Sequence, residues 1–260
     1  MKKYIRMSYE GEIRYGILAE DGQVHILSGN GPENFQETGI VTALQNQELI
    51  PCVPSKIVGT GLNYTDVVLK EGESLPKKPK LFIKPPTTLV GDGGYVVVPP
   101  MVKDLSCEVE LAVVIGKACK CVSEDKAEEY IWGYTVANDM TASDLQAEDT
   151  LWGRAKSFDT FLPVAPYIIA DIDASNLVLK SRINGEPGQL GNTKDLLKSV
   201  PWLVSYISHV MTLLPGDMII TGTPSGYGKK VKAGDSMDME IEGIGKVSNE
   251  IKSIEGPYYF

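Results

Sequence analysis

The sequence lacks long apolar runs and is poor in cysteine. None of its apolar runs approaches the roughly 20 residues that a membrane-spanning helix needs, so we expect no transmembrane segment. Lys2 and Lys3 are not followed by an apolar signal segment, and we therefore expect no export. No Cys-x-x-Cys pair and no zinc-ligand spacing occurs, which predicts reduced thiols in a cytoplasmic protein. The four cysteines are Cys52, Cys107, Cys119 and Cys121.

Positive charge is also scarce. Lysine and arginine together number 25 against 34 aspartates and glutamates, which gives a net charge of -9. This balance argues against nucleic acid or an anionic membrane as a partner, because both attract basic surfaces. It leaves room for a small anionic substrate, since a bound metal ion can reverse the field of a single site. With 260 residues, 43% of them hydrophobic, the chain is otherwise typical of a globular protein.

The chain divides into two parts at about residue 50. Residues 1–50 contain short alternating segments separated by turn sequences at Glu10-Gly11 and Asp21-Gly22. This pattern is typical of a small antiparallel β module. Pro51 and Pro54 mark the boundary. Residues 51–260 carry longer and more apolar strand patterns, and they form the predicted main domain.

Helical patterns are few in the main domain. One runs from Ser123 to about Ile131 and another from Pro201 to about Leu213, whereas Asn184-Gly185 predicts a β-hairpin. No repeat or low-complexity segment is visible. We therefore predict a mostly β protein with a few helices on the outside, of the α+β class.

Two glutamates stand at the head of a strongly apolar run that extends from Cys107 to Gly116. The run is short, β-branched and ended by glycine, which predicts a buried strand. Side chains alternate along a strand, so Glu108 and Glu110 point to the same face. Like charges so close together are tolerable if a cation lies between them, and carboxylate pairs bind hard ions such as Mg²⁺. The alternative is an exposed strand end on which both carboxylates are solvated.

Three further segments carry candidate functional groups. Asp139 follows the predicted strand Tyr134–Ala137 and would complete a set of metal ligands, although a turn rich in Asx and Ser/Thr caps explains it equally well. Lys156 lies between aromatics, where it could place a positive charge near a developing oxyanion; a solvated surface lysine is the alternative. The glycine-rich segment Thr221–Gly226 is not a P-loop, yet its backbone N–H groups and Thr223 could hold a carboxylate.

These segments belong to a longer series of motifs in the main domain. The motifs are Gly61–Tyr64, Lys84–Pro86, Glu108–Gly116, Gly133–Asp139, Lys156–Phe161, Asn184–Glu186 followed by Gln189, Asn192 and Thr193, and Pro215–Gly226. Together they resemble the fumarylacetoacetate hydrolase (FAH) family, in the expected order, from about Lys56 to the C-terminus. The resemblance implies the family's mixed β-sandwich roll, usually in a homodimer. Residues 1–50 resemble the small N-terminal β module that many members carry.

The resemblance also implies a metal and a class of substrate. Members bind Mg²⁺ or Mn²⁺, and some bind Ca²⁺; the ligands that carry over are Glu108, Glu110 and Asp139. Lys156 corresponds to the family's active-site lysine. Substrates are small 2-oxo or 1,3-dicarbonyl acids, and the reactions are C–C bond hydrolysis, decarboxylation, and keto–enol or double-bond isomerisation. All of them build negative charge on an enolate oxygen, which a chelated divalent cation stabilises. The substrate-contacting positions that carry over are Gln146 and Thr223, with Gly222 beside it.

Three positions depart from the family pattern. Where hydrolases and decarboxylases carry a histidine and a glutamate on a lid, this chain has Val67 and Lys70. Val67 cannot transfer a proton, and the two histidines of the chain, His25 and His209, lie away from the motifs. Ser143 replaces an arginine that commonly holds a substrate carboxylate, so this substrate-binding position loses a charge-assisted contact.

We therefore expect an intact metal site without the usual water-activating pair. Hydrolysis by that route is not expected, whereas tautomerisation, isomerisation or metal-assisted decarboxylation needs less from the protein. Lys156 or Lys70 would move the proton, and Lys70 would need a lowered pKa to act as a base near neutrality. Two alternatives remain open. One is a C–C bond hydrolase of the acylpyruvate or fumarylacetoacetate type, and the other is a catalytically silent binder of a metal–dicarboxylate complex.

Overall fold

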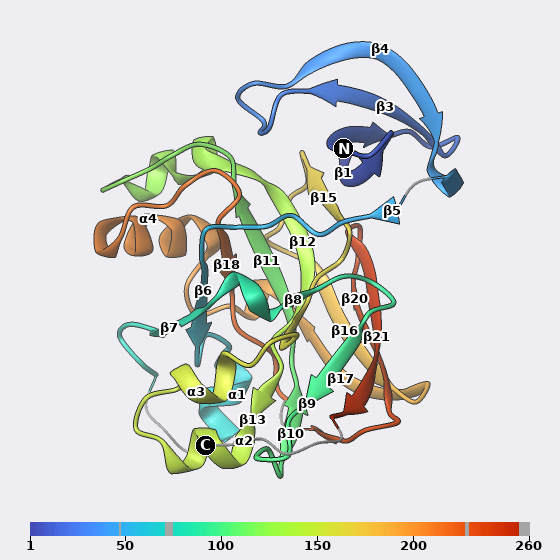
Figure 1. The fold of residues 1–260 in the computed structure, drawn as a ribbon. Coiled ribbons are helices and arrows are strands. Elements are labelled where there is room, and N and C mark those ends of the chain that lie inside the picture. Colours follow the sequence, from blue (N-terminus) through green and yellow to red (C-terminus); the bar gives the residue numbers. More distant parts are fainter. Residues whose placement is uncertain (47, 71–74, 227–228, 255–260) are drawn as a thin grey trace.

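The computed structural model describes residues 1–46, 48–70, 75–226 and 229–254 (Figure 1). Side chains are described for the same residues except 46, 48, 68–70 and 229. Within this part of the chain strands dominate and helices are short, so the prediction of a mostly β protein with few helices is confirmed. None of the described helices is long and apolar enough to cross a membrane.

One large mixed sheet contains most of the strands in the described part of the chain. Its order is β4-β3-β2-β1-β15-β12-β11-β18-β6-β7, and β5 pairs with β1. β18 and β6 run parallel, and their outer neighbours pair with them antiparallel. The bounds in sheet order are β4 Gln36–Ala43, β3 Gln23–Ser28, β2 Glu12–Leu18, β1 Lys2–Tyr9, β15 Tyr167–Ala170, β12 Ile131–Asn138, β11 Val109–Ile115, β18 Met218–Ile220, β6 Ile57–Gly61 and β7 Lys80–Lys84, with β5 Glu48–Leu49.

A second sheet packs against the middle of the first. Side chains of β11 and β12 meet those of β16, β20 and β21, and together they enclose the main hydrophobic core. The bounds in sheet order are β17 Glu186–Asn192, β16 Val178–Ile183, β20 Ser236–Ile241, β21 Gly245–Ser253 and β9 Tyr95–Val98. Two small sheets complete the described strands: β13 Thr141–Ala142, β10 Leu105–Cys107 and β19 Lys229–Val231 in one, β14 Leu162–Pro163 and β8 Leu89–Val90 in the other.

The strand β11 is buried on both faces because each face meets a different core. Leu111 and Val113 point into the main core between the two sheets. Ala112 and Val114 join a second cluster that includes side chains of β6 and β18. Side chains alternate along a strand, so Glu110 shares the face of Ala112 and Val114. The glutamates therefore lie on the side of the large sheet that faces away from the five-stranded sheet.

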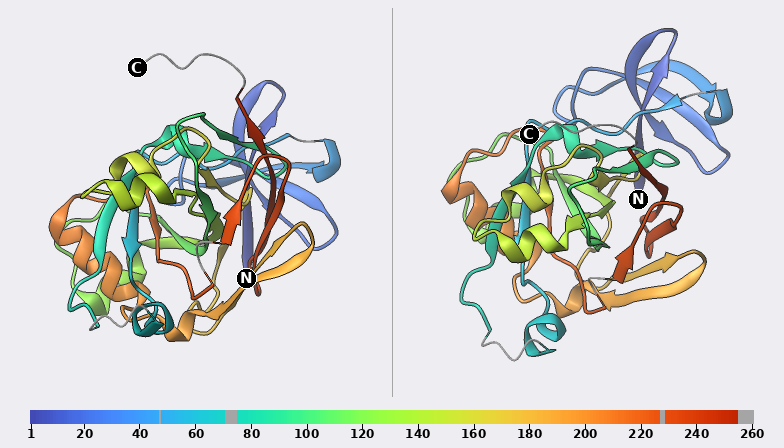
Figure 2. Two further views of the ribbon diagram at one scale, coloured as in Figure 1. Left: turned by 90° about the horizontal axis from the view of Figure 1, so that it is seen from below. Right: turned by 60° about the horizontal axis from the view of Figure 1, so that its bottom comes forward.

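The strands β1 to β4 form consecutive antiparallel hairpins. They lie at the end of the molecule opposite α1, α2 and α3 (Figures 1 and 2). Gly11 and Gly22 both have a φ of 80°, which explains glycine at the two predicted turns. Ile5, Met7 and Val24 belong to a small separate core. Because β1 also pairs with β15, these strands extend the large sheet, and a domain boundary at residue 50 stays a prediction.

Helices are short and sit around the sheets (Figure 1). The predicted segment at Ser123 forms a 3-10 helix, and the one at Pro201 forms α4. Ser199 caps α4 by accepting a hydrogen bond from the Trp202 N–H, and α4 ends at Val210 rather than at Leu213 because Met211 is extended. The bounds are α1 Thr65–Lys70, α2 Ser143–Glu148, α3 Gly153–Lys156, α4 Val200–Val210, and the 3-10 helices η1 Leu44–Asn46, η2 Pro86–Thr88, η3 Glu124–Tyr130 and η4 Thr193–Asp195.

Candidate metal and substrate site

Three carboxylates meet where two central strands begin and end. Glu108 stands just before β11, Glu110 lies in it, and Asp139 directly follows β12. Antiparallel pairing places the start of β11 beside the end of β12, so residues about thirty positions apart become neighbours. Ligand oxygens of the three side chains lie within 4.8 Å of one another, and all three residues are buried.

Two buried lysines neutralise part of this charge. The Lys156 ammonium donates hydrogen bonds to Glu108 Oε2 at 2.9 Å, to Asp139 Oδ2 at 2.5 Å and to Thr141 Oγ1 at 2.6 Å. The Lys84 ammonium donates to Asp139 Oδ1 at 2.6 Å. Both oxygens of Asp139 are therefore bound, whereas Glu110 forms no salt bridge within the described residues. When all three carboxylates are ionised, the two ammonium groups balance only two of them, and one negative charge has no partner in the cluster.

Burial and mutual repulsion set the pKa values of these groups. Burial, followed by the charges of Asp139 and Glu108, raises the pKa of Glu110 well above its ordinary value. Burial also raises the pKa of Glu108. For Asp139 burial opposes ionisation, but the ammonium groups of Lys156 and Lys84 outweigh it and lower the pKa. A cation near Glu110 would relieve its cost of ionisation, so the residues present fit a divalent metal.

Backbone and side-chain hydrogen bonds orient Glu110 and hold the loop after β18 beside it. The Gly222 N–H donates to Glu110 Oε2 at 2.7 Å. The Thr223 hydroxyl donates to the Val109 carbonyl at 2.9 Å and accepts from Gln189 Nε2 at 2.7 Å. Gln189 Oε1 in turn accepts from the Val109 N–H. The loop after β18 is thereby locked to β11 beside the carboxylates.

A cavity with about 440 Å³ of empty space, part of it open to solvent, lies over the carboxylates. Seven of the predicted site residues line it, so the fold brings together segments that are distant in the sequence. They are Glu108, Glu110, Asp139, Gln146, Lys156, Gly222 and Thr223. Thr60, Gly61, Leu62, Val67, Phe82 and Trp152 complete the described lining.

Two predicted residues are not among this lining. Ser143 begins α2, and its hydroxyl shares a hydrogen bond of 2.8 Å with the Ser106 hydroxyl. Lys70 is the last residue of α1, and its side chain lies outside the described part of the structure. Val67, one turn earlier on α1, does line the cavity.

The sequence did not single out Lys84, Thr141, Phe82 or Trp152 as site residues. Strand alternation puts Phe82 and Lys84 on one face of β7, but the sequence alone does not show that this face turns inward. A lysine on the inward face of a buried strand needs an acidic partner, and here the partner is Asp139. Trp152 lies between two short helices and carries no periodic signal.

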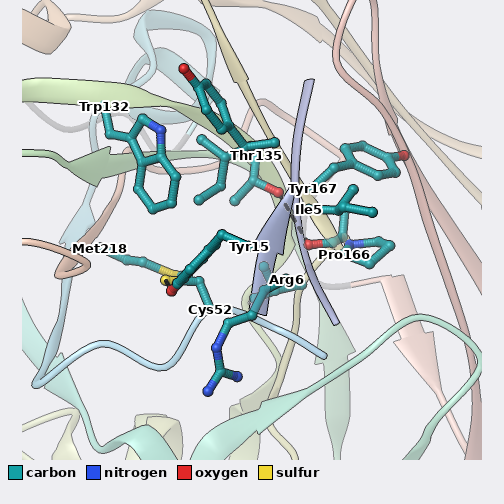
Figure 3. Close-up of a pocket in the computed structure, with 13 residues that line it drawn as sticks. Ile5, Arg6, Tyr15, Cys52, Trp132, Thr135, Pro166, Tyr167 and Met218 are labelled. Carbon is teal, nitrogen blue, oxygen red and sulfur yellow. Dashed lines mark hydrogen bonds between the residues drawn. The ribbon is translucent and has the colours of Figure 1, made fainter. Parts of the chain in front are cut away.

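A second cavity, with about 270 Å³ of empty space that includes open solvent, lies between the N-terminal strands and the main sheet (Figure 3). Tyr15, Trp132, Thr135 and Tyr167 are among the side chains around it, and the Tyr15 hydroxyl lies 3.8 Å from Cys52 Sγ. Its described lining includes no aspartate, glutamate or histidine. We interpret it as a packing junction rather than as a reaction site.

Comparisons with known proteins agree with this geometry. Residues 56–252 match the model of the fumarylacetoacetate (FAA) hydrolase C-terminal family, and residues 2–51 match an Rv2993c-like N-terminal family. The mitochondrial oxaloacetate tautomerase FAHD1 of Arabidopsis thaliana is 41% identical over 76% of this chain and 91% of its own length. The crystal structure of 5-carboxymethyl-2-hydroxymuconate delta-isomerase from Mycobacterium smegmatis has a TM-score of 0.90 at 35% identity, covering 98% of this chain and 100% of that one.

One further structure bears on the cluster of carboxylates. Fumarylpyruvate hydrolase from Pseudomonas aeruginosa, solved with Mn²⁺ and pyruvate, has a TM-score of 0.72 at 30% identity, covering 76% of this chain and 90% of that one. The relatives thus include a tautomerase, an isomerase and a hydrolase. Because the family model spans β6 to β21 and every motif around the three carboxylates, the chain belongs to the fumarylacetoacetate hydrolase family.

Proposed function

We propose that the protein is a divalent-metal-dependent enzyme that acts on a small, enolisable 2-oxo or 1,3-dicarbonyl acid. Keto–enol tautomerisation, double-bond isomerisation and decarboxylation are the reactions we favour. The observation that carries this proposal is the buried set Glu108, Glu110 and Asp139, in which Glu110 has no ammonium partner among the described residues. The tautomerase and the isomerase among the relatives support it.

Glu108, Glu110 and Asp139 would hold the metal. Mg²⁺ is our first choice, with Mn²⁺ or Ca²⁺ as alternatives, because all three suit sites made of oxygen ligands. When bound, such an ion supplies Lewis acidity that stabilises negative charge on a carbonyl oxygen. The chain itself keeps Asp139 ionised, because Lys84 and Lys156 bind it, and the Gly222 N–H orients Glu110.

Lys156 is our principal catalytic candidate. Burial opposes its charge, but Asp139, Glu108 and Glu110 outweigh burial and raise its pKa, so it is an ammonium group here. An ammonium beside the carboxylates can donate a hydrogen bond to an enolate oxygen and return a proton to carbon. Lys70 is the second candidate for proton transfer, supported only by its position on α1, whose Val67 lines the cavity.

Substrate contacts are proposed at four positions with unequal support. Gln146 lines the cavity and has the strongest support. Thr223 would have to turn its hydroxyl away from the Val109 carbonyl before it could donate to a substrate carboxylate. The Gly222 N–H already serves Glu110, and Ser143 would have to leave Ser106. Gly222 therefore contributes to the substrate site mainly through its shape, and Ser143, which is not in the described lining, has the weakest support.

C–C bond hydrolysis is the second candidate reaction, because fumarylpyruvate hydrolase is among the structural relatives. Val67 argues against it, since this buried apolar side chain cannot activate water. We further propose a homodimer, by analogy with the family, and a cytoplasmic location, from the cysteine content and the lack of apolar runs.

Ultraviolet absorbance of oxaloacetate and acylpyruvates, with Mg²⁺ and then with a chelator, tests the proposal. We expect a metal-dependent loss of the enol band, followed by product analysis to separate tautomerisation from cleavage. Glu110→Gln should lower kcat/KM by about 100-fold or more, because a metal ligand is lost. The exposed Glu250→Gln is the matched control. Turnover that persists in chelator, or in Glu110→Gln, would contradict the proposal.

A further inference from the structure

The walls of the site cavity above the carboxylates are uncharged within the described lining. The charged lining residues are Glu108, Glu110, Asp139 and Lys156, and all four belong to the cluster described above. The remaining side chains are polar but neutral, or apolar. The apolar ones are Leu62, Val67, Phe82 and Trp152. Among the described lining residues, charge is thus confined to the carboxylate cluster and Lys156.

An aromatic row leads from the charged end toward the surface. The Lys156 ammonium lies 5.0 Å from the centre of the Phe82 ring, and the ring centres of Phe82 and Trp152 are 5.9 Å apart. Phe82 is buried and Trp152 is half-buried. The row therefore gives the cavity a direction, from the carboxylates outward along two aromatic faces.

Two glycines of β6 make room for these rings. A Cβ atom at Gly59 would come within 2.1 Å of the Phe82 ring, and one at Gly61 within 2.3 Å of the Trp152 ring. Gly59 and Gly61 lie on one face of β6 because strand residues alternate. The aromatic wall is therefore seated on a backbone that only glycine allows.

Leu62 continues the wall from a strained backbone. Its φ is 60°, in the left-handed region that non-glycine residues rarely adopt. Asn63 holds this conformation, because its side chain donates to the Thr221 carbonyl at 2.9 Å and accepts from the Lys198 N–H at 2.9 Å. Strain that the surroundings maintain at a lining residue points to a functional demand for its side chain.

Val67 completes the wall from α1. The preceding residue, Asp66, accepts a hydrogen bond from the Ser225 N–H at 3.0 Å, which ties α1 to the loop that carries Thr223. Val67 is 5% exposed and faces the cavity. The apolar wall is therefore held on four elements: the end of β6, the start of α1, β7 and the segment between α2 and α3.

We propose that this cavity selects acids whose far end, away from the 2-oxo carboxylate, is uncharged and apolar, such as acylpyruvates with an alkyl or aryl acyl group. The inference rests on the proposed function, which binds the 2-oxo carboxylate end at Glu108, Glu110 and Asp139. A second carboxylate at the far end would lose its water against Leu62, Val67 and Trp152. Lys80, whose ammonium lies 5.0 Å from the centre of the Trp152 ring, is not part of the described lining. Each methylene buried there should instead improve kcat/KM by about fourfold.

The first test measures kcat/KM with Mg²⁺ for acetyl-, butanoyl- and hexanoylpyruvate and for an acylpyruvate of similar length that ends in a carboxylate. We expect kcat/KM to rise about fourfold per methylene until the cavity is filled. The kcat/KM of the dicarboxylate should be about tenfold or more below that of its neutral match.

Trp152→Ala should flatten the rise of kcat/KM with chain length. Trp202→Ala is the matched control, because Trp202 is also half-buried under a lysine ammonium but lies on α4. Val67→Thr, which keeps the size and adds a hydroxyl, should weaken the length dependence without unfolding the chain.

The second test separates this inference from the proposed function. Thermal unfolding is followed with Mg²⁺ and oxalate, which presents only the chelating end, and with 2-oxo acids of increasing alkyl length. If oxalate stabilises the protein, and stabilisation by the 2-oxo acids grows with their alkyl length, the inference is supported even if no acid is turned over. Stabilisation by oxalate without any gain from alkyl length, or a preference for the dicarboxylate that Lys80→Ala or Lys70→Ala removes, would overturn the inference alone. No response to Mg²⁺ and oxalate would overturn the proposed function, and this inference with it.

Discussion

Glu110 differs from the other two carboxylates of the site in its partners. Lys156 binds Glu108 and Asp139, whereas Glu110 receives only the Gly222 N–H among the hydrogen bonds of the described residues. Burial, with the neighbouring charges of Asp139 and Glu108, therefore raises its pKa well above the ordinary 4.5. We therefore expect the response of the site to protons, and to the proposed metal, to depend strongly on this residue.

The pH dependence of stability follows from the sign of that shift. The folded chain keeps the Glu110 proton to a higher pH than the unfolded chain, so without metal stability should fall as pH rises above about 4.5 toward the raised pKa. The lowered pKa of Asp139 acts only at more acidic pH. Melting temperatures between about pH 5 and pH 8, in chelator and in Mg²⁺, check this. Mg²⁺ should flatten the decline, whereas Glu110→Gln should reduce it and leave the part that comes from the raised pKa of Glu108. A flat curve for the unmodified chain in chelator would contradict this prediction.

The helix α1 carries two of the three positions that depart from the family pattern given above, Val67 and Lys70. Val67 lines the cavity at the position where that pattern has a histidine, and Asp66 ties the helix to Ser225. The helix is therefore docked over the carboxylates but offers no titratable group at position 67. This is the physical reason to expect reactions that need no activated water.

Restoring the family pair on α1 should create hydrolase activity. In Val67→His combined with Lys70→Glu, the imidazole would enter the cavity and could take a proton from water, a contribution of about 100-fold or more for a general base. Acylpyruvate cleavage, followed by release of pyruvate, measures it, with Val67→Leu as an apolar control at the same position. If the double variant folds, binds Mg²⁺ and still shows no gain, the lid pair is not the limiting difference.

Some of these elements could be predicted from the sequence, and others could not. The alternation in β11 predicted that Glu108 and Glu110 share a face, and Asp139 was expected because it ends a strand; the three now lie together. Lys84 was missed because its partner depends on which face of β7 turns inward, and a short apolar strand does not show this. Trp152 was missed because its neighbourhood depends on glycines of β6, far away in the chain.

At the scale of the whole molecule, the N-terminal strands and the main sheet share one aromatic junction. The Trp132 ring of β12 lies 5.5 Å from the ring centres of Tyr4, Tyr15 and Phe35. Such contacts bury large surfaces and add a preference for edge-to-face geometry. The two parts of the chain should therefore unfold together rather than separately.

Phe35→Ala tests this coupling. The ring is half-buried, so its loss should cost about 2 kcal/mol, less than for a fully buried phenylalanine. Urea unfolding, followed by tryptophan fluorescence and by circular dichroism, should show one shifted transition with both probes. Glu33→Ala, at an exposed position close to Phe35 in the sequence, serves as the control. Two separate transitions would show instead that residues 1–50 behave as an independent domain.

The pairing of β1 with β15 also has a consequence for solubility. An uncovered β15 would present unpaired backbone groups beside the apolar Ile168 and Ile169, a template on which other chains can add strands. With β1 in place, the outer edges of the large sheet are β4 and β7 instead. β7 runs into Pro85 and Pro86, which cannot continue a ladder, and it exposes Lys80. We therefore expect residues 1–50 to act as a cover that limits edge-to-edge aggregation of the sheet that carries the three carboxylates.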